Sequence, residues 1–508
     1  MNILSNLTFG FETILSPETL VYCFLGVTVG MLIGVLPGIG AMAAISMLLP
    51  ITFYLEPTQA LIMLAGIYYG AQYGNSIASI LLNTPGTPSG AVTALDGYPL
   101  AQQGKAGPAL FITTLASFFG SCFAIICLAA FTPAIAQFAL DFGSAEFFAL
   151  MVFGLIAAST VAPGSRVKGL AMVVIGLLLG LVGTDVTSGA LRFTFGMVEL
   201  GDGLNLVAVA MGVFGVAEVI NNLSRPQNKR QQPDALKIRQ LIPSRSDLRL
   251  AIKPCLRGAP IGTFIGVLPG AGATIASYVA YGVETQIATD RTRFGKGAIE
   301  GIAAPEAANN AAAQAGFIPT LALGIPGDAV MALMLGALLI HGVNPGPGLI
   351  TDHPEIFWGL LASFWVGNFM LLIMNIPLIG LWVKILSIPY KYLYPGVLML
   401  VCVGVYSVNN NPFDLIVVFV FSAIGYGMVL ARLSPAPMML GLVLGPMMEE
   451  NFRRAMLLAR GDPLALIERP ITGSLLAASV CLLLWPLFQR AIHRKTLKNG
   501  ALEDQPEP

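Results

Sequence analysis

Polar side chains gather around two Pro-Gly sequences that lie inside otherwise apolar stretches of the chain. The residues around the first are Tyr73, Asn75, Ser76, Ser79, Asn83, Thr84, Thr87 and Ser89. Those around the second are Glu306, Asn309, Asn310, Gln314, Thr320 and Asp328. Hydroxyl, amide and carboxylate oxygens are hard ligands that suit a small cation such as Na⁺, and the N-termini of half-helices can hold an anion's carboxylates. Because a polar residue inside a membrane segment is costly, each cluster indicates a binding site.

The Pro-Gly sequences occur as two matched pairs. The run Gly34–Ala41 (GVLPGIGA) returns as Gly266–Ala273 (GVLPGAGA), and Asn83–Gly86 (NTPG) returns more loosely as Gly324–Gly327 (GIPG). A Pro-Gly break frees backbone N–H and C=O groups that lipid cannot satisfy. Breaks at corresponding positions in two halves of a chain are typical of the binding site of a secondary transporter. Simple kinks or tight turns between membrane helices remain the alternative.

The predicted substrate- and ion-binding residues are these breaks together with their polar neighbours. They are Pro37, Gly38, Gly40, Asn75, Ser76, Asn83, Thr84, Pro85, Gly86, Thr87, Pro269, Gly270, Gly272, Glu306, Asn309, Asn310, Gly324, Pro326, Gly327 and Asp328. The sodium-site candidates among them are Asn83, Thr84, Asn309, Asn310 and Asp328. Other roles stay open at three places. Asn309 and Asn310 could join neighbouring helices, Glu306 could lie in a loop or cap a helix, and Asp328 could cap the next helix.

Composition defines the class of protein that must position these residues. Of 508 residues, 56% are hydrophobic and only 11% are charged, and the mean hydropathy is +0.77. A soluble protein carries roughly 25% charged residues. Apolar runs long enough to cross about 30 Å of hydrocarbon recur along the chain. We therefore expect an all-α polytopic membrane protein with about 10 to 14 membrane segments, some of them Pro-Gly-broken helices or re-entrant hairpins.

Charge and cysteine usage narrow the functional classes. The formal net charge is zero, which gives no bias towards nucleic acid. The six cysteines are scattered without a Cys-x-x-Cys pair, and the three histidines are not spaced as metal ligands. We expect that the protein is not an enzyme and that it needs no cofactor apart from a coupling ion, Na⁺ or H⁺.

A basic stretch divides the chain into two membrane units. Residues 1–222 are predicted to form an N-terminal repeat, 223–257 a basic linker, 258–490 a C-terminal repeat and 491–508 a polar tail. The linker holds most of its charge as lysine and arginine, which places it in the cytoplasm by the positive-inside rule.

The two repeats are expected to be inverted relative to one another. Their similarity extends beyond the breaks, since Leu115–Phe119 resembles Leu361–Trp365. The first basic residue of the chain is Lys105, which favours an N-terminus outside and an odd number of crossings in the first half. Arginines near the C-terminus conflict with a simple topology, because they both precede the last apolar segment, as at Arg453, and follow it, as at Arg490.

Long motifs of this chain resemble the large membrane subunit of the tripartite tricarboxylate transporters. The matching runs are Gly34–Ala41, Tyr73–Ile77, Leu82–Pro88, Ala94–Ala101, Ala303–Ala312 and Leu323–Gly327. The resemblance implies a multi-pass carrier of the bacterial inner membrane. It also implies a small membrane subunit and a periplasmic solute-binding protein as partners, with a possible homo-oligomer. Its substrates would be di- or tricarboxylates such as citrate, taken up by cation symport.

The chain departs from the family pattern at two predicted site residues. The family usually has a small residue where this chain has Asp328, and a glycine where it has Asn75. The identity of the carboxylate therefore stays open. The expected mechanism is alternating access, and the alternatives are a stand-alone carboxylate carrier or a channel that needs no binding protein.

Overall fold

The computed structural model describes residues 3–36, 40–161, 165–185, 187–224, 241–386 and 390–484. The first half contains α1 (Ile3–Ile14), α2 (Pro17–Val35), α3 (Ala41–Thr52), α4 (Pro57–Leu82), α5 (Gly90–Gln102), α6 (Ala106–Ala139), α7 (Ser144–Val161), α8 (Arg166–Gly180), β1 (Gly183–Thr184), β2 (Leu191–Arg192), η1 (Val198–Leu200), α9 (Leu206–Ala210), η2 (Met211–Val216) and α10 (Ala217–Ser224). The second half contains α11 (Arg245–Val267), α12 (Gly272–Ile287), η4 (Arg291–Arg293), α13 (Glu300–Ala315), α14 (Phe317–Leu323), α15 (Ala329–Ile340), α16 (Leu349–Asp352), α17 (Pro354–Asn375), α18 (Ile379–Leu386), α19 (Tyr390–Asn409), α20 (Phe413–Leu430), α21 (Ala436–Leu458) and α22 (Leu464–Ile467), followed by a helix over Pro470–Leu484.

The chain is an all-α polytopic membrane protein, as its composition predicts. Five helical segments among the described residues are long and apolar enough to cross a bilayer: Pro17–Val35, Ala106–Ala139, Leu206–Leu223, Pro354–Asn375 and Phe413–Leu430. Leu206–Leu223 joins α9 and α10 through the π-helix η2. The single sheet in the described part of the chain is the two-stranded antiparallel pair of β1 with β2.

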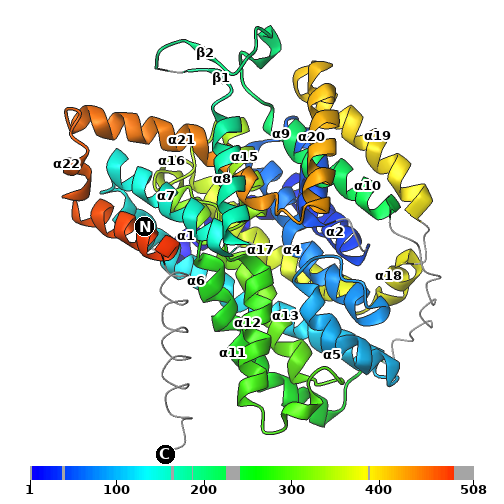
Figure 1. Ribbon diagram of the computed structural model, residues 1–508. Helices are drawn as coiled ribbons and strands as arrows, with labels where there is room; N and C mark the ends of the chain where they lie inside the picture. Colours follow the sequence, from blue (N-terminus) through cyan, green and yellow to red (C-terminus); the bar gives the residue numbers. More distant parts are fainter. Residues whose placement is uncertain are drawn as a thin grey trace, which may run out of the picture.

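The helices run between two ends of the molecule, which we call the linker end and the hairpin end (Figure 1). At the linker end α11 begins, and the α12–α13 connection meets the α5–α6 connection, where Gln103 Nε2 donates to the Lys296 carbonyl at 2.8 Å. At the hairpin end β1 and β2 stand above the helices. The hairpin and the beginning of α11 lie at opposite ends of the molecule in this view.

Rows of glycines bring two pairs of helices into close contact. Gly26, Gly30 and Gly34 of α2 face α4, and a Cβ added at any of them would overlap a backbone oxygen of α4. A matching row on α11 consists of Gly258, Gly262 and Gly266, and a Cβ there would overlap the carbonyl oxygens of Ala304, Ala308 and Ala312 on α13. Small residues of this spacing allow membrane helices to pack backbone against backbone.

The three predicted Pro-Gly breaks that the structure describes each separate two helices. Pro85-Gly86 lies between α4 and α5, Pro269-Gly270 between α11 and α12, and Pro326-Gly327 between α14 and α15. Asn83 and Gly324 end α4 and α14 in the left-handed conformation that commonly terminates a helix. The predicted site residues Pro37 and Gly38 lie outside the described residues, as do residues 225–240 of the predicted linker and the whole polar tail. Duplication of the two halves stays a prediction.

Ion pairs hold the hairpin to α21. Asp185, directly after β1, accepts hydrogen bonds from the Ser188 hydroxyl at 2.7 Å and from Arg453 at 3.1 Å. Arg192 of β2 pairs with Glu449 at 2.8 Å, and Glu449 also pairs with Arg453 at 2.6 Å. The hairpin is thus fixed to the last turns of one helix by a network of four charged side chains.

The charge network predicts how the hairpin responds to acid. The Ser188 hydroxyl, the Thr187 N–H and the neighbouring guanidinium of Arg453 lower the pKa of Asp185 from 3.8 to about 2. Because the folded-state pKa is the lower one, this carboxylate stabilises the hairpin fully above pH 3.8 and loses that effect as the pH falls through about 2. We expect pepsin to cleave the 191–198 segment slowly at pH 4 and rapidly near pH 2. Asp185→Asn should already be cleaved rapidly at pH 4, and equal rates for the two proteins there would contradict the prediction.

Candidate functional site

The two breaks of the second half lie against one another, and in the first half the second break lies against the end of α2. A Cβ added at Gly86 would overlap the carbonyl oxygen of Gly34, so the second break of the first half closes onto the end of α2. In the second half the Gly270 N–H donates to the Gly327 carbonyl at 2.7 Å. Gly272 lies beside Asp328, and a Cβ there would be 3.2 Å from the Asp328 side chain. Glycine is needed at position 86 because the backbone of Gly34 approaches too closely for a side chain, and at positions 270 and 272 because their φ angles are 81° and 58°.

Amide side chains of α4 hold the loop of the first break. Asn75 Oδ1 accepts the Thr87 N–H at 2.9 Å, and Gln72 Oε1 accepts the Ser89 hydroxyl at 2.9 Å. The other amide atom of Asn75, Nδ2, is buried without a hydrogen-bond partner. Asn83 and Thr84 are exposed at the tip of the loop. The predicted site residue Ser76 instead donates to the Tyr73 carbonyl of its own helix at 2.8 Å.

Glu306 is the centre of a buried polar cluster between α13, α5 and α6. Its Oε1 accepts the Thr93 hydroxyl at 2.5 Å and its Oε2 accepts the Ser117 hydroxyl at 3.2 Å. Asn310 Nδ2 donates to Ser117 Oγ at 2.8 Å and to Asn309 Oδ1 at 2.6 Å. These side chains are all at most 1% exposed. Glu306 therefore lies on a helix inside the bundle rather than in a loop or at a helix cap.

The Glu306 cluster contains negative charge without a positive partner. Among the described residues, no lysine or arginine forms a hydrogen bond or ion pair with Glu306. An ionised carboxylate is costly in a protein interior unless a cation or a proton accompanies it. Thr93 and Ser117 each offer one hydroxyl hydrogen, which orients the carboxylate but does not neutralise it. The site is thus arranged to accept a proton or a small cation.

Further polar atoms on α13 are buried without partners. They are Asn309 Nδ2, Asn310 Oδ1, and both polar atoms of the Gln314 side chain. Glu306, Asn310 and Gln314 follow one another at intervals of four residues, which places them along one face of α13. An unpartnered buried polar atom costs about 1–3 kcal/mol, so several on one helix call for an explanation such as a bound ion or water.

Asp328 caps α15 and also joins the two halves of the chain. Its Oδ1 accepts the Met331 N–H at 2.9 Å, which is the capping role that the sequence left open. Its Oδ2 accepts the Tyr68 hydroxyl of α4 at 2.6 Å. Within the described residues, no hydrogen bond joins Asn83 or Thr84 to the other three sodium-site candidates. A single site made from all five residues stays a prediction.

A substitution at Asp328 separates capping from charge. Serine also caps helix N-termini, so Asp328→Ser should retain most of the stability of α15 while removing the carboxylate. For the cation-coupled uptake of carboxylates that the family resemblance implies, we expect weaker dependence on the cation and a changed ranking of substrates. Tyr68→Phe is the matched control, because it removes the same hydrogen bond and keeps the charge. Unchanged cation dependence and ranking in Asp328→Ser would assign the residue to capping alone.

Among the polar residues of the site that were not predicted are Tyr68, Thr93, Asp96 and Ser117. Asp96 Oδ1 accepts the N–H groups of Gly297 and Ala298, both at 2.8 Å, just before α13 begins, and so positions the helix that carries Glu306. A signal for it exists in the sequence, since Asp96 is an isolated acid in a long stretch without other charged acids. The other three are hydroxyls on apolar helices, which no sequence pattern distinguishes from ordinary packing.

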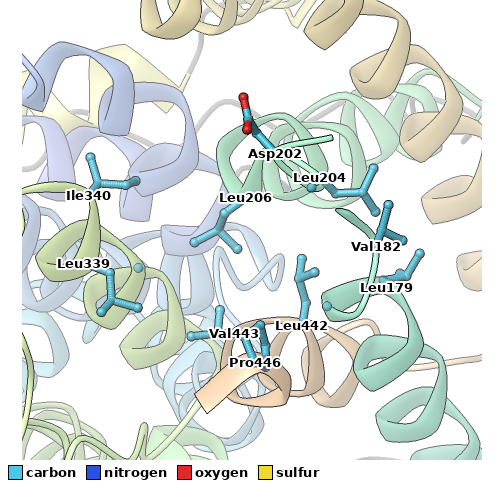
Figure 2. Close-up of a pocket in the computed structure, with 13 residues that line it drawn as sticks. Leu179, Val182, Asp202, Leu204, Leu206, Leu339, Ile340, Leu442, Val443 and Pro446 are labelled. Carbon is cyan, nitrogen blue, oxygen red and sulfur yellow. The ribbon is translucent and has the colours of Figure 1, made fainter. Parts of the chain in front are cut away.

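A cavity of about 460 Å³ lies apart from these clusters, near the hairpin end (Figure 2). Its lining comes from α8, α15, α21 and the segment that leads from the hairpin into α9, and it is mostly apolar. The Asp202 side chain points away from the space. None of the predicted site residues lines this cavity.

Broken helices that meet inside a multi-pass bundle, with buried polar side chains beside the breaks, define the architecture of a membrane transporter. The sequence matches the model of the tripartite tricarboxylate transporter TctA family over residues 20–440, and the chain belongs to that family. Members are the large membrane subunits of tripartite systems, which also comprise a small membrane subunit and a periplasmic binding protein.

Two similar proteins come from Agrobacterium vitis. One, described as an uncharacterized 52.8 kDa protein in the TAR-I ttuC' 3' region, is 50% identical over 480 residues, which cover 94% of this chain and 95% of that protein. The other, an uncharacterized protein in the TAR-II ttuC' 3' region, is 50% identical over 224 residues, or 44% of this chain and 93% of that protein. No solved structure matches the chain.

Proposed function

We propose that this chain is the translocating subunit of a binding-protein-dependent system that takes up di- or tricarboxylates across the bacterial inner membrane, driven by a cation gradient. The observation that carries the proposal is Glu306, a fully buried carboxylate with hydroxyl partners and, among the described residues, no lysine or arginine paired with it. A group of this kind can bind and release a proton or Na⁺ as the protein changes conformation.

The coupling ion is proposed to bind along the inner face of α13. Asn310 Oδ1 and Gln314 Oε1 are oxygen atoms without partners, and oxygen ligands suit Na⁺. Protonation of Glu306 would serve the same purpose for H⁺. Release of the ion would leave the Glu306 carboxylate buried and ionised without a counter-ion. This raises the free energy of the empty state relative to the loaded state.

The substrate is proposed to bind at the breaks, where backbone N–H groups replace basic side chains. The N-termini of α3 and α5 follow the breaks of the first half, and helix N-termini attract anions. Gly40, before α3, has open space where a Cβ would lie, and Asn83 and Thr84, before α5, are exposed. Neither break contains lysine or arginine, so the bound cation would supply the remaining positive charge.

The glycine rows support alternating access as the transport mechanism. They pack α2 on α4 and α11 on α13, so that each pair with its break can move as a unit. Helices with smoother apolar sequences, such as α7 and α20, would form the scaffold against which these units move.

Uptake of labelled carboxylates into proteoliposomes tests the proposal. The liposomes would contain the chain with its small membrane subunit, with and without the substrate-loaded binding protein, under Na⁺ and proton gradients in turn. We expect uptake only when the binding protein and one of the gradients are both present. Gradient-driven uptake without the binding protein would indicate a stand-alone carrier. Downhill flux that depends neither on the binding protein nor on an ion gradient would indicate a channel and contradict the proposal.

A further inference from the structure

An exposed apolar patch covers the second half of the hairpin. We call it the hairpin patch, and its residues are Leu191, Phe193, Phe195, Met197 and Val198. Phe195 is 84% exposed and Val198 is 88% exposed, which is unusual for large apolar side chains in a segment whose base is fixed by ion pairs. Such patches on otherwise ordered segments mark sites of interaction.

The backbone of the patch is held in an unfavourable conformation. Phe193 and Phe195 have φ angles of 54° and 51°, a region that bulky residues rarely adopt. Between them the buried Thr194 accepts the Met197 N–H at 2.9 Å, and the ion pairs of Asp185 and Arg192 fix the base of the hairpin. The structure thus maintains strain in order to present two phenylalanines outward, and residues held this way cluster at functional sites.

The side of the membrane on which the patch lies follows from the distribution of basic residues. The linker end carries Lys105, Arg245, Arg249, Lys253, Arg291, Arg293 and Lys296. The basic residues beside the hairpin are fewer, namely Arg192, Arg453 and Arg454. The positive-inside rule places the linker end in the cytoplasm. The hairpin patch at the opposite end then faces the periplasm.

We propose that the hairpin patch is the docking surface for the periplasmic solute-binding protein, which would contact it through an apolar spot surrounded by basic residues. The inference rests on the proposed function for the partner and for the orientation in the membrane. It assigns a role to a segment that lies outside the buried clusters of the transport site.

The charges beside the patch favour a protein over the membrane surface. Glu199 and Asp202 are exposed carboxylates that form no ion pair within the described residues. Segments that insert into anionic lipid headgroups are rich in lysine and arginine instead. The hairpin also stands clear of the helices in Figure 1, so the patch does not continue their lipid-facing surface. An apolar centre with a charged rim is the usual composition of a protein interface.

Docking at this surface would act on a helix of the proposed transport site. The chain leaves the hairpin through Leu204 and enters α9 at Leu206, whose side chain lies against Gly336 of α15. That helix begins next to Asp328. The cavity of Figure 2 lies between the base of the hairpin and α15, so this part of the structure is not tightly packed.

The binding affinity of the partner tests the proposal. The chain with its small membrane subunit in lipid nanodiscs would be titrated with the substrate-loaded solute-binding protein. For the double variant Phe195→Asp with Val198→Asp we expect Kd to rise at least about tenfold, as for loss of central apolar anchors. The matched control is Ile242→Asp, which changes a residue that is 69% exposed at the linker end and should leave Kd unchanged.

The outcomes separate this inference from the proposed function. If the wild-type complex does not bind the solute-binding protein at all, the tripartite function fails. If it binds and the double variant binds within about twofold of it, the docking surface is wrong. A photo-crosslinking residue at position 195 gives an independent answer. Crosslinks to the solute-binding protein would support the proposal, whereas crosslinks to lipid or to the small membrane subunit would overturn it.

Discussion

Replacing Glu306 with glutamine should uncouple uptake from its cation gradient while leaving the protein folded. Glutamine has nearly the same shape, and its amide can exchange hydrogen bonds with the hydroxyls of Thr93 and Ser117, because a hydroxyl both donates and accepts. The negative charge that attracts the cation is lost. A coupling free energy of about 1–3 kcal/mol corresponds to a change of about 5- to 150-fold. We expect the cation concentration for half-maximal uptake to rise by a factor in this range, or uptake to become independent of the gradient.

Glu300→Gln provides the control for this experiment. Glu300 lies in the first turn of the same helix, where it pairs with Arg293 at 3.2 Å near the linker end. The same chemical change there removes a partly exposed ion pair, which contributes at most about 1 kcal/mol. Uptake by Glu300→Gln should keep the wild-type cation dependence. If Glu306→Gln also kept it, with the protein monodisperse and thermally stable, the cation would bind elsewhere.

Most of the fold could be predicted from hydrophobic composition and from Pro-Gly spacing. Continuous apolar runs identify membrane helices because lipid requires about 20 such residues, and the run from Ala109 to Phe131 lies within α6. The breaks at Pro85, Pro269 and Pro326 do separate helices. The hairpin was missed, because two strands of two residues each leave no alternating pattern to detect.

The polar contacts of the site could be predicted only in part. Glu306, Asn309 and Asn310 were predicted as site residues from their chemistry and their place by the second break, since charged and amide side chains are rare in apolar segments. Their partners were not, because Thr93 and Ser117 become partners only through the packing of α5 and α6 against α13. The same holds for Tyr68, which meets Asp328 from the other half of the chain. Local sequence gives no information about which helix faces which.

Replacing Gly262 with alanine should destabilise the protein strongly, although the change adds only one methyl group. The new Cβ would overlap the carbonyl oxygen of Ala308, and the backbone of α13 cannot rotate that oxygen away without breaking its helical hydrogen bonds. The helices would have to separate along the whole row from Gly258 to Gly266. Overpacking of a tight core typically costs 1–3 kcal/mol, and we expect about 3 kcal/mol here. Thermal unfolding of the detergent-solubilised protein measures this loss.

Gly282→Ala is the matched substitution, on α12. Nothing lies within 4 Å of a Cβ added there, and alanine favours helix over glycine by about 1 kcal/mol, so this variant should be as stable as the wild type or more so. A large difference between the two variants would establish that backbone contact between α11 and α13 holds the second half together. That contact also sets the position of Glu306, because Gly262 packs against α13, which is the helix that carries this carboxylate. We therefore expect that Gly262→Ala, measured at a low temperature where it remains folded, also shows a weaker dependence of uptake on the cation. If both variants were equally stable, the close approach of α11 and α13 would not be a feature of the folded protein.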